Sequence, residues 1–312
     1  MFFVVYLGGK EGCEAAQSEL DGFAIVRSVE PSYEAVKAVL KEANAVLDAS
    51  MRVRFTEQMI SSAPLLRVIS CATTGSDHID HDASATFGIS IRTLREDQEL
   101  LQDLTPAAEL SWALVMACAR NLIGAHAHVC AGEWVREEFP GVMLKGRTLG
   151  LIGCGRIGGW MARYGAAFGM KVLAYDPQQE SLPDGVARES LRGLISSSDI
   201  ISVHVHLTSE TEGLVSAALF SEIKPGAIFV NTSRGGLIDE GALLAGLVSG
   251  RIAAAGLDVL QQEPDIRDDP LVAYARDNEN LLITPHCGGF SPDAVRIVCA
   301  RAAQKIRADL SS

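Results

Sequence analysis

The chain has 312 residues, of which 48% are hydrophobic and 21% charged, and its formal net charge is −12 at pH 7. This length suits two domains of about 100–200 residues each, and the acidic balance argues against a nucleic-acid-binding surface. The sequence has no lysine- or arginine-rich run, and the apolar run 110–119 is about half of the ~20 residues of a membrane span, so we expect no membrane partner.

The seven cysteines are an odd number and show neither C-x-x-C nor Cys/His ligand spacing. We therefore expect no disulfide framework and no metal site. The apolar N-terminus, Met1–Leu7, has no basic segment and is at the short limit for the apolar core of a signal peptide. We interpret it as a first strand and expect a cytoplasmic protein.

Residues 1–100 alternate short apolar strands with amphipathic helices, the pattern of a small α/β domain. The helix predicted for residues 33–43 has apolar side chains at helical spacing, and that for residues 56–62 begins with a threonine suited to capping. The predicted strands cover residues 3–7, 23–26, 45–47, 66–70 and 89–91.

The loop Ala72–Asp80 follows one of these strands directly and contains a glycine. Such a loop can aim backbone N–H groups at a carboxylate, and an ordinary turn is the simpler alternative.

The polar, acidic stretch Arg95–Asp103 then marks a linker or a surface excursion. Thr105-Pro106 starts the next helix, with a capping hydroxyl followed by proline at the first helical position. We predict one helix from there to about Ala131. Its first half is apolar nearly all round, as expected for a helix buried between domains or at a subunit interface.

The stretch Leu149–Gly158, Leu-Gly-Leu-Ile-Gly-Cys-Gly-Arg-Ile-Gly, has the form of a buried strand that turns into a helix. Gly153 permits the turn, Gly155 lets a phosphate approach the main chain, and Gly158 lets the helix pack on the strand. The pyrophosphate of a dinucleotide would lie at the helix N-terminus. The motif alone is as compatible with a glycine-rich turn, but an apolar strand before it and a helix-like segment after it favour a dinucleotide.

Asp176 ends the next apolar run, about 20 residues beyond the glycines, where a carboxylate can accept hydrogen bonds from the adenosine ribose. It would repel a 2′-phosphate, and the following Pro-Gln-Gln supplies no arginine. The predicted cofactor is therefore NAD and not NADP.

The alternation of strands and helices continues, with strands predicted for residues 200–205, 227–231, 253–259 and 281–284. Ligands of such a sheet collect outside the carboxyl ends of its strands, where the chain carries Arg234, Glu263 and His286.

These three residues form a chemically complete set for reducing a 2-oxo acid. Arg234 suits a carboxylate and a carbonyl, His286 can give a proton to the developing alkoxide, and Glu263 can keep that histidine protonated. Each alone has a simpler explanation: a surface arginine, a solvated acid, a histidine satisfied in its loop. Together, at successive strand ends after a cofactor motif, they favour catalysis.

The sequence resembles the D-isomer-specific 2-hydroxyacid dehydrogenases, which include phosphoglycerate dehydrogenases and glyoxylate/hydroxypyruvate reductases. The resemblance covers nearly the whole chain and rests on residues 68–70, 74–80, 146–150, 153–158, 199–204, 223–226, 231–240, 257–259, 263–264 and 284–286. It implies an α/β fold of two Rossmann-like domains with doubly wound parallel sheets. The NAD-binding domain, residues 101–289, would be inserted into the substrate domain, residues 1–100 plus 290–312, to which a last helix at about 292–310 returns.

The resemblance also implies roles for single residues. Arg234, Glu263 and His286 would be catalytic, and Arg234 with the N–H groups of Gly75 and Ser76 would bind the substrate. The NAD site would be lined by Gly153, Gly155, Arg156, Ile157, Gly158, Asp176, Val205, Thr232, Ser233, Asp258, Gly289 and Thr74. The expected partners are NAD and a small 2-oxo or 2-hydroxy acid. With the apolar helix after Pro106, the resemblance also implies a homodimer.

Three features depart from the family pattern. The acidic stretch 95–104 lengthens a connection and could form an extra wall over the active-site cleft, and His206 replaces a usual proline. Ser50-Met51 stands where phosphoglycerate-type members often carry Arg-Ser, although Arg52 or Arg54 could substitute. We therefore expect an NAD-dependent dehydrogenase of a small unphosphorylated acid. The alternatives are D-3-phosphoglycerate dehydrogenase and an NAD-sensing binding protein of corepressor type.

Overall fold

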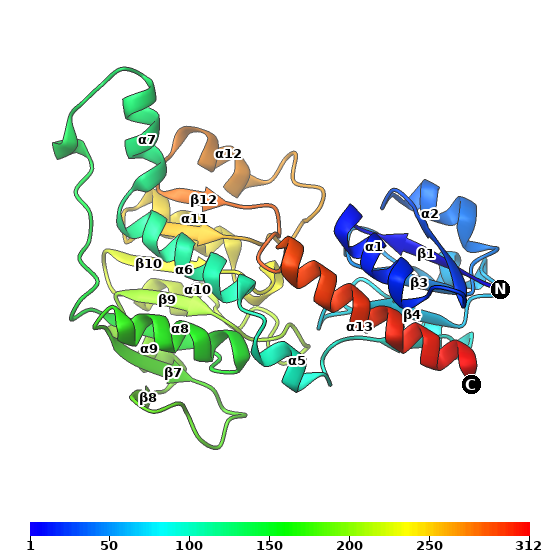
Figure 1. The fold of residues 1–312 in the computed structure, drawn as a ribbon. Coiled ribbons are helices and arrows are strands. Elements are labelled where there is room, and N and C mark those ends of the chain that lie inside the picture. The colour runs from blue at the N-terminus through cyan, green and yellow to red at the C-terminus, as the bar shows by residue number, and fades with distance from the viewer. The chain divides into compact units, whose positions relative to one another are not determined.

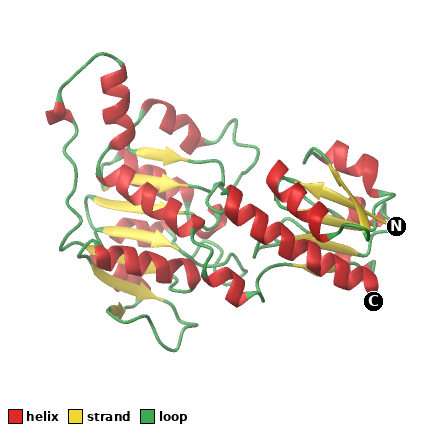
Figure 2. Ribbon diagram, viewed as in Figure 1, coloured by secondary structure: helices red, strands yellow, loops and turns green.

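The computed structural model describes residues 1–312, and the chain divides into two compact units. Unit 1 consists of residues 1–104 and 289–312, and unit 2 consists of residues 105–288. Each unit is built on its own parallel β-sheet with helices (Figure 1, Figure 2). The predicted fold class, two doubly wound parallel sheets with one unit inserted into the chain of the other, is confirmed.

The sheet of unit 1 has the strand order β2-β1-β3-β4-β5, and every pairing is parallel. Strands β3 and β4 are buried along their whole length, as expected for a parallel sheet covered on both faces. The strands are β1 (Phe2–Leu7), β2 (Ala24–Ser28), β3 (Ala45–Asp48), β4 (Val68–Cys71) and β5 (Ser90–Arg92).

Helices cover both faces of this sheet. One face packs against α1 (Lys10–Glu19) and α13 (Pro292–Ser311). The other packs against α2 (Tyr33–Leu40), α3 (Glu57–Ser61) and α4 (His81–Thr86). The last helix thus returns to the first unit, as the resemblance implied. Thr56 precedes α3, but its side chain makes no capping hydrogen bond, so that part of the prediction was wrong.

The acidic stretch after β5 is an ordered part of unit 1. It forms the short helix α5 (Gln98–Gln102). Asp97, just before this helix, forms ion pairs with Arg301 Nε at 2.6 Å and Lys305 Nζ at 2.5 Å. Burial raises the pKa of the Asp97 carboxyl, but the bonds to Lys305 and Arg301 outweigh it and hold that pKa below its usual value. Of the two interpretations of this stretch, the linker was therefore wrong and the surface excursion is confirmed, because most of its side chains are exposed.

The sheet of unit 2 has the strand order β12-β11-β10-β9-β6-β7-β8, again with parallel pairings only. Its order reverses between β6 and β9, so the carboxyl ends of these strands flank the place where such sheets bind ligands. The strands are β6 (Thr148–Ile152), β7 (Lys171–Tyr175), β8 (Val186–Arg188), β9 (Ile200–Val203), β10 (Ala227–Asn231), β11 (Ile252–Leu257) and β12 (Leu281–Ile283).

The helices of unit 2 cover both faces of its sheet. One face packs against α6 (Pro106–Ala119) and α8 (Arg156–Ala167). The other packs against α9 (Leu191–Ser197), α10 (Ala217–Glu222) and α11 (Glu240–Val248), with α12 (Pro270–Asp277) beside β12. Short 3₁₀ turns, η1 (Arg136–Glu138) and η2 (Gly235–Leu237), complete the unit.

The single helix predicted after Thr105 is two helices. Asn121 adopts a left-handed conformation with φ 44° and separates α6 from α7 (Leu122–Cys130), with a bend of 62° at the break. Leu114 and Val115 of α6 lie in the core of unit 2, so this helix packs against the sheet of unit 2. The Thr105 hydroxyl donates to Glu109 Oε1 at 2.5 Å and caps no backbone N–H.

Only one pair of consecutive helices, bent at the break between them, has the length and apolar composition of a membrane span. No single helix is long and apolar enough to cross a membrane, and the pair 98–119 and 122–130 passes that test only by length and composition.

Candidate active site

The turn after β6 is shaped by its three glycines. Gly153 has φ 90°, and a Cβ there would lie 2.4 Å from the His204 carbonyl oxygen. A Cβ on Gly158 would lie 2.2 Å from the Gly153 carbonyl oxygen, whereas one on Gly155 would meet no atom within 4 Å. Two glycines are therefore required by packing, and the third leaves space in front of α8.

The N-terminus of α8 is suited to an anion. No side chain caps it at Gly155, and the positive end of the helix dipole points at the open space beside this glycine. Arg156 and Ile157 form the first turn of the helix. These residues fit the pyrophosphate of a dinucleotide, whose phosphates need backbone N–H donors and room at the main chain.

Asp176 follows β7 and joins the glycine turn to the next loop. Its Oδ2 accepts from the Cys154 N–H at 2.8 Å, and its Oδ1 accepts from the N–H groups of Gln178 and Gln179 at 3.0 and 3.2 Å. A carboxylate has about four acceptor positions, so capacity remains for ribose hydroxyls.

Arg188 on β8 lies at the same loop and was missed from the sequence. Its guanidinium donates to the carbonyl oxygens of Asp176 at 2.5 Å and Gln179 at 2.6 Å. The strand that carries it, β8, has three residues with mostly exposed side chains, so no apolar pattern in the sequence predicts a strand there.

The loop after β9 carries His204, Val205 and His206. His204 Nε2 hydrogen-bonds to Ser202 Oγ at 2.8 Å, its Nδ1 is buried without a partner, and burial lowers its pKa to about 3. This histidine is therefore neutral at pH 7. The His206 carbonyl oxygen accepts from Thr211 Oγ1 at 2.6 Å.

The loop after β10 is held by the fully buried Asn231. Its Nδ2 donates to the Arg234 carbonyl oxygen at 2.9 Å, and its Oδ1 accepts from the Ser233 N–H at 3.0 Å. Thr232 Oγ1 and Ser111 Oγ are 2.6 Å apart. Asn231 thus fixes the turn that presents Arg234, a role that its sequence position did not reveal.

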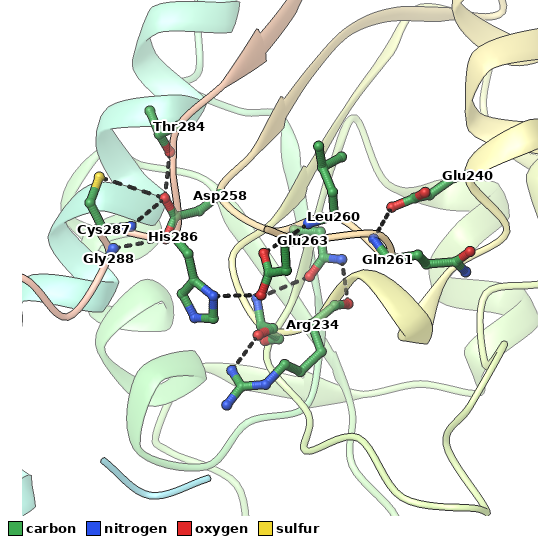
Figure 3. Close-up of polar contacts among 12 residues, drawn as sticks. Arg234, Glu240, Asp258, Leu260, Gln261, Glu263, Thr284, His286, Cys287 and Gly288 are labelled. Carbon is green, nitrogen blue, oxygen red and sulfur yellow. Dashed lines mark hydrogen bonds and ion pairs between the residues drawn. The ribbon is translucent and has the colours of Figure 1, made fainter. Parts of the chain in front are cut away.

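His286 and Glu263 form the central pair of the site. His286 Nδ1 lies 2.7 Å from Glu263 Oε1, and the two side chains are 31% and 32% exposed. Because Nδ1 faces the carboxylate, Nε2 is the ring nitrogen left to face a substrate. Figure 3 shows Arg234 in the same group as this pair, so the structure brings all three predicted catalytic side chains together in unit 2.

The loop that carries His286 is fixed by Asp258, which is 1% exposed. Asp258 Oδ1 accepts from Thr284 Oγ1 at 2.5 Å and the Cys287 N–H at 2.9 Å, and Oδ2 accepts from the Gly288 N–H at 2.7 Å (Figure 3). His286 itself has φ 51°, and its N–H donates to the Asp258 carbonyl oxygen at 2.8 Å. Both carboxylate oxygens of Asp258 thus hold the loop that carries His286.

The other predicted residues lie in unit 1. Thr74, Gly75 and Ser76 belong to the loop after β4, and Gly289 begins the second segment of the unit. Ser76 Oγ lies 3.0 Å from His81 Nε2, and the Gly75 carbonyl oxygen accepts from the Thr73 hydroxyl at 2.9 Å. A buried pair, His78 Nε2 and Asp48 Oδ2 at 2.9 Å, ties this loop to the end of β3.

Two family models match the chain. The D-isomer specific 2-hydroxyacid dehydrogenase NAD binding domain matches residues 112–288, and the catalytic domain of the same family matches residues 4–95. The first model covers the glycine turn of unit 2, and NAD is accordingly the cofactor of this chain.

Similar proteins carry related names. A D-3-phosphoglycerate dehydrogenase of Mycobacterium bovis is 34% identical over 284 residues, which are 90% of this chain and 52% of that protein, so the chain spans about half the length of such relatives. A hydroxypyruvate reductase of Thermotoga maritima is 36% identical, over 85% of this chain and 84% of that protein.

Among solved structures, the D-lactate dehydrogenase from Aquifex aeolicus complexed with NAD and lactic acid matches with a TM-score of 0.85 and 27% identity, covering 99% of this chain and 95% of that chain. The family models and the relatives together confirm the resemblance found in the sequence: the chain belongs to the D-isomer specific 2-hydroxyacid dehydrogenase family.

Proposed function

We propose that the protein is an NAD-dependent enzyme that interconverts a small 2-oxo acid and the D-2-hydroxy acid by hydride transfer. The observation that carries this proposal is the 2.7 Å contact between His286 Nδ1 and Glu263 Oε1, in one group with Arg234. This group lies at the carboxyl edge of a sheet whose first turn suits a dinucleotide. Family membership supports the same reaction class.

In this mechanism bound NADH supplies the hydride that reduces the substrate's carbonyl carbon. Arg234 binds the carboxylate and polarises the carbonyl through its forked N–H donors. His286 Nε2 gives its proton to the developing alkoxide, while Glu263 orients the ring and stabilises the imidazolium. In unit 1, the loop of Gly75 and Ser76 is proposed to offer its backbone N–H groups to a carboxylate.

The cofactor contacts are part of this proposal. The first turn of α8 holds the pyrophosphate and Asp176 holds the adenosine ribose. Thr74, Val205, Thr232, Ser233, Asp258 and Gly289 line the remainder, with Asp258 acting chiefly by holding the loop of His286.

We expect His286→Ala to lower kcat by about 10²–10⁴-fold, the usual worth of general acid catalysis. Glu263→Gln should move the alkaline limit of reduction to lower pH, because the imidazolium loses its anionic partner and releases its proton more readily. Steady-state reduction rates from pH 5.5 to 9, with NADH binding as a control, would check both. Near-parental turnover by a His286→Ala protein that still binds NADH would contradict the mechanism.

We expect higher kcat/KM with NADH than with NADPH, since the Asp176 carboxylate favours ribose hydroxyls and repels a 2′-phosphate. Asp176→Ala should lower kcat/KM for NADH by roughly 10–100-fold, the effect of losing a hydrogen bond to a charged group. Gln178→Ala, in the same loop, serves as the matched control. Equal efficiency with both cofactors in the parent would refute this preference.

The substrate is proposed to be a small unphosphorylated 2-oxo acid, such as glyoxylate or hydroxypyruvate. From Asp48, the last residue of β3, to Met51, which precedes Arg52, the chain has no cation for a phosphate. Asp48 is buried and accepts from the N–H and hydroxyl of Ser50 at 2.8 and 2.9 Å.

Reduction kinetics on a panel of 2-oxo acids with NADH would test both the activity and this substrate class. We expect kcat/KM to be highest for an unphosphorylated acid of two or three carbons. A higher value for a phosphorylated acid would instead establish the phosphoglycerate dehydrogenase alternative, and NADH binding without turnover of any acid would favour the corepressor-type alternative.

A homodimer is proposed through α7 and the segment that follows it. The ribbon of this segment projects from the rest of unit 2 (Figure 1). Its exposed apolar side chains include Leu122 at 57%, Ile123 at 53%, Trp134 at 85% and Met143 at 74%. Exposed apolar surface concentrated on one segment is typical of a protein interface. The segment is ordered by its own contacts, since His128 Nε2 accepts from the Val135 N–H at 3.1 Å.

Sedimentation analysis at micromolar concentration should show a dimer for the parent and a shift toward monomer for Trp134→Glu. Val248→Glu, which changes an equally apolar exposed residue on α11, should leave the parental mass. A monomeric parent would reject this interface.

The proposed compartment is the cytoplasm. All seven cysteines are free thiols, the state that a reducing compartment maintains, and fractionation of the source cells would test this.

A further inference from the structure

The turn Leu260–Glu263 between β11 and α12 carries Glu263 and is held by two carboxylates. Glu263 Oε2 accepts from the Leu260 N–H at 3.2 Å, and Glu240 Oε1 accepts from the next N–H, that of Gln261, at 2.8 Å. Figure 3 shows Glu240 and His286 on opposite sides of this turn. A displacement of the turn would therefore move the Glu263 carboxylate relative to His286.

Glu240 approaches the turn from a fixed position. It is the first residue of α11, whose N-terminus is capped by Asp239 through the Ala242 N–H at 2.9 Å. The side chain of Gln261 adds a second hydrogen bond, because its Nε2 donates to the Ile238 carbonyl oxygen at 3.0 Å. Gly235 packs directly on the turn, since a Cβ there would lie 2.2 Å from the Gln261 nitrogen.

Glu240 lies six residues after Arg234, on the same continuous segment of chain. Residues 235–237 form η2 immediately after Arg234, and α11 starts three residues later. The Glu240 bond to Gln261 therefore links the loop that presents Arg234 to the turn that presents Glu263.

We infer that Glu240 is a positioning residue for the Glu263–His286 pair, acting through the Gln261 N–H and the Leu260–Glu263 turn. This inference rests on the proposed function for its kinetic consequences. Glu240 contacts neither His286 nor a reacting atom, so its effect passes through Glu263.

The charge of Glu240 bears on the same pair. Burial raises the pKa of the Glu240 carboxyl to about 7; the Gln261 N–H opposes this, and the charges of Asp269 and Glu263 add to it. These acidic groups face it from the start of α12 and from the turn, and Asp239 precedes it on its own element. Above neutral pH the ionised Glu240 therefore adds negative charge on the side of the turn away from His286, behind Glu263.

The test compares Glu240→Gln and Glu240→Ala with the parent, using Asp277→Asn at the exposed far end of α12 as the control. Glu240→Gln keeps an acceptor for the Gln261 N–H and removes the charge. We expect its kcat to stay within about threefold of the parent at pH 6, and its alkaline limit of reduction to lie at lower pH. Glu240→Ala should lose about tenfold in kcat at every pH, as expected for a lost hydrogen bond, with little change in KM for NADH.

A role in folding alone would lower activity in proportion to folded protein and leave the pH profile unchanged. A parental pH profile for folded Glu240→Gln would overturn the inference, and this variant decides the matter if Glu240→Ala does not fold.

A second readout does not require turnover. The NMR titration of the His286 ring, assigned with His286→Ala, should show a lower midpoint in Glu240→Gln than in the parent and the Asp277→Asn control. If the parent reduces no 2-oxo acid, the proposed function fails, yet a lowered midpoint would still support the coupling. An unchanged midpoint would reject it.

Discussion

The hydrogen bond between His286 Nδ1 and Glu263 Oε1 joins two loops that the sheet alone does not hold together. One loop follows β12, and the other is the turn after β11, so their side chains could be spaced in many ways. On one side the buried Asp258 carboxylate fixes Thr284, Cys287 and Gly288 around the histidine. On the other, Glu240 fixes the turn at Gln261. The 2.7 Å contact therefore joins two loops that are each held by a carboxylate.

The parallel topology explains why these parts are close at all. Every strand of unit 2 runs in the same direction, so the loops after β6, β7, β9, β10, β11 and β12 leave from one edge of the sheet. The glycine turn, Asp176, Arg234 and His286 come from four of these loops. Asn231 and Asp258 then act alike: Asn231 ends β10 and Asp258 directly follows β11, and each is buried and uses its side chain to hold a loop at that edge.

Features that depend on local sterics could be predicted from the sequence. Gly153 and Gly158 were predicted for a turn and a close approach, and the structure requires them there. Features that depend on distant partners could not. The ion pairs of Asp97 join residues more than 200 positions apart in sequence, and they form because α13 returns to unit 1. Arg188 lies on a strand too short for a pattern. The polar pair Arg120-Asn121 is the one local sign of the break between α6 and α7, and the apolar residues on both sides of it favour a single helix.

The charged groups around the Glu263–His286 pair are mostly carboxylates that accept backbone hydrogen bonds. Arg234 is the cation of this group, whereas Glu263, Glu240, Asp258 and Asp269 place carboxylates beside His286 or on the loops that hold it. Burying carboxylates is costly unless they accept hydrogen bonds, and here backbone N–H groups supply them: Cys287 and Gly288 to Asp258, Leu271 and Val272 to Asp269, Gln261 to Glu240. Each bond that offsets the cost of a buried acid also fixes a piece of backbone. The acids around the Glu263–His286 pair thereby hold the loops that keep His286 in place.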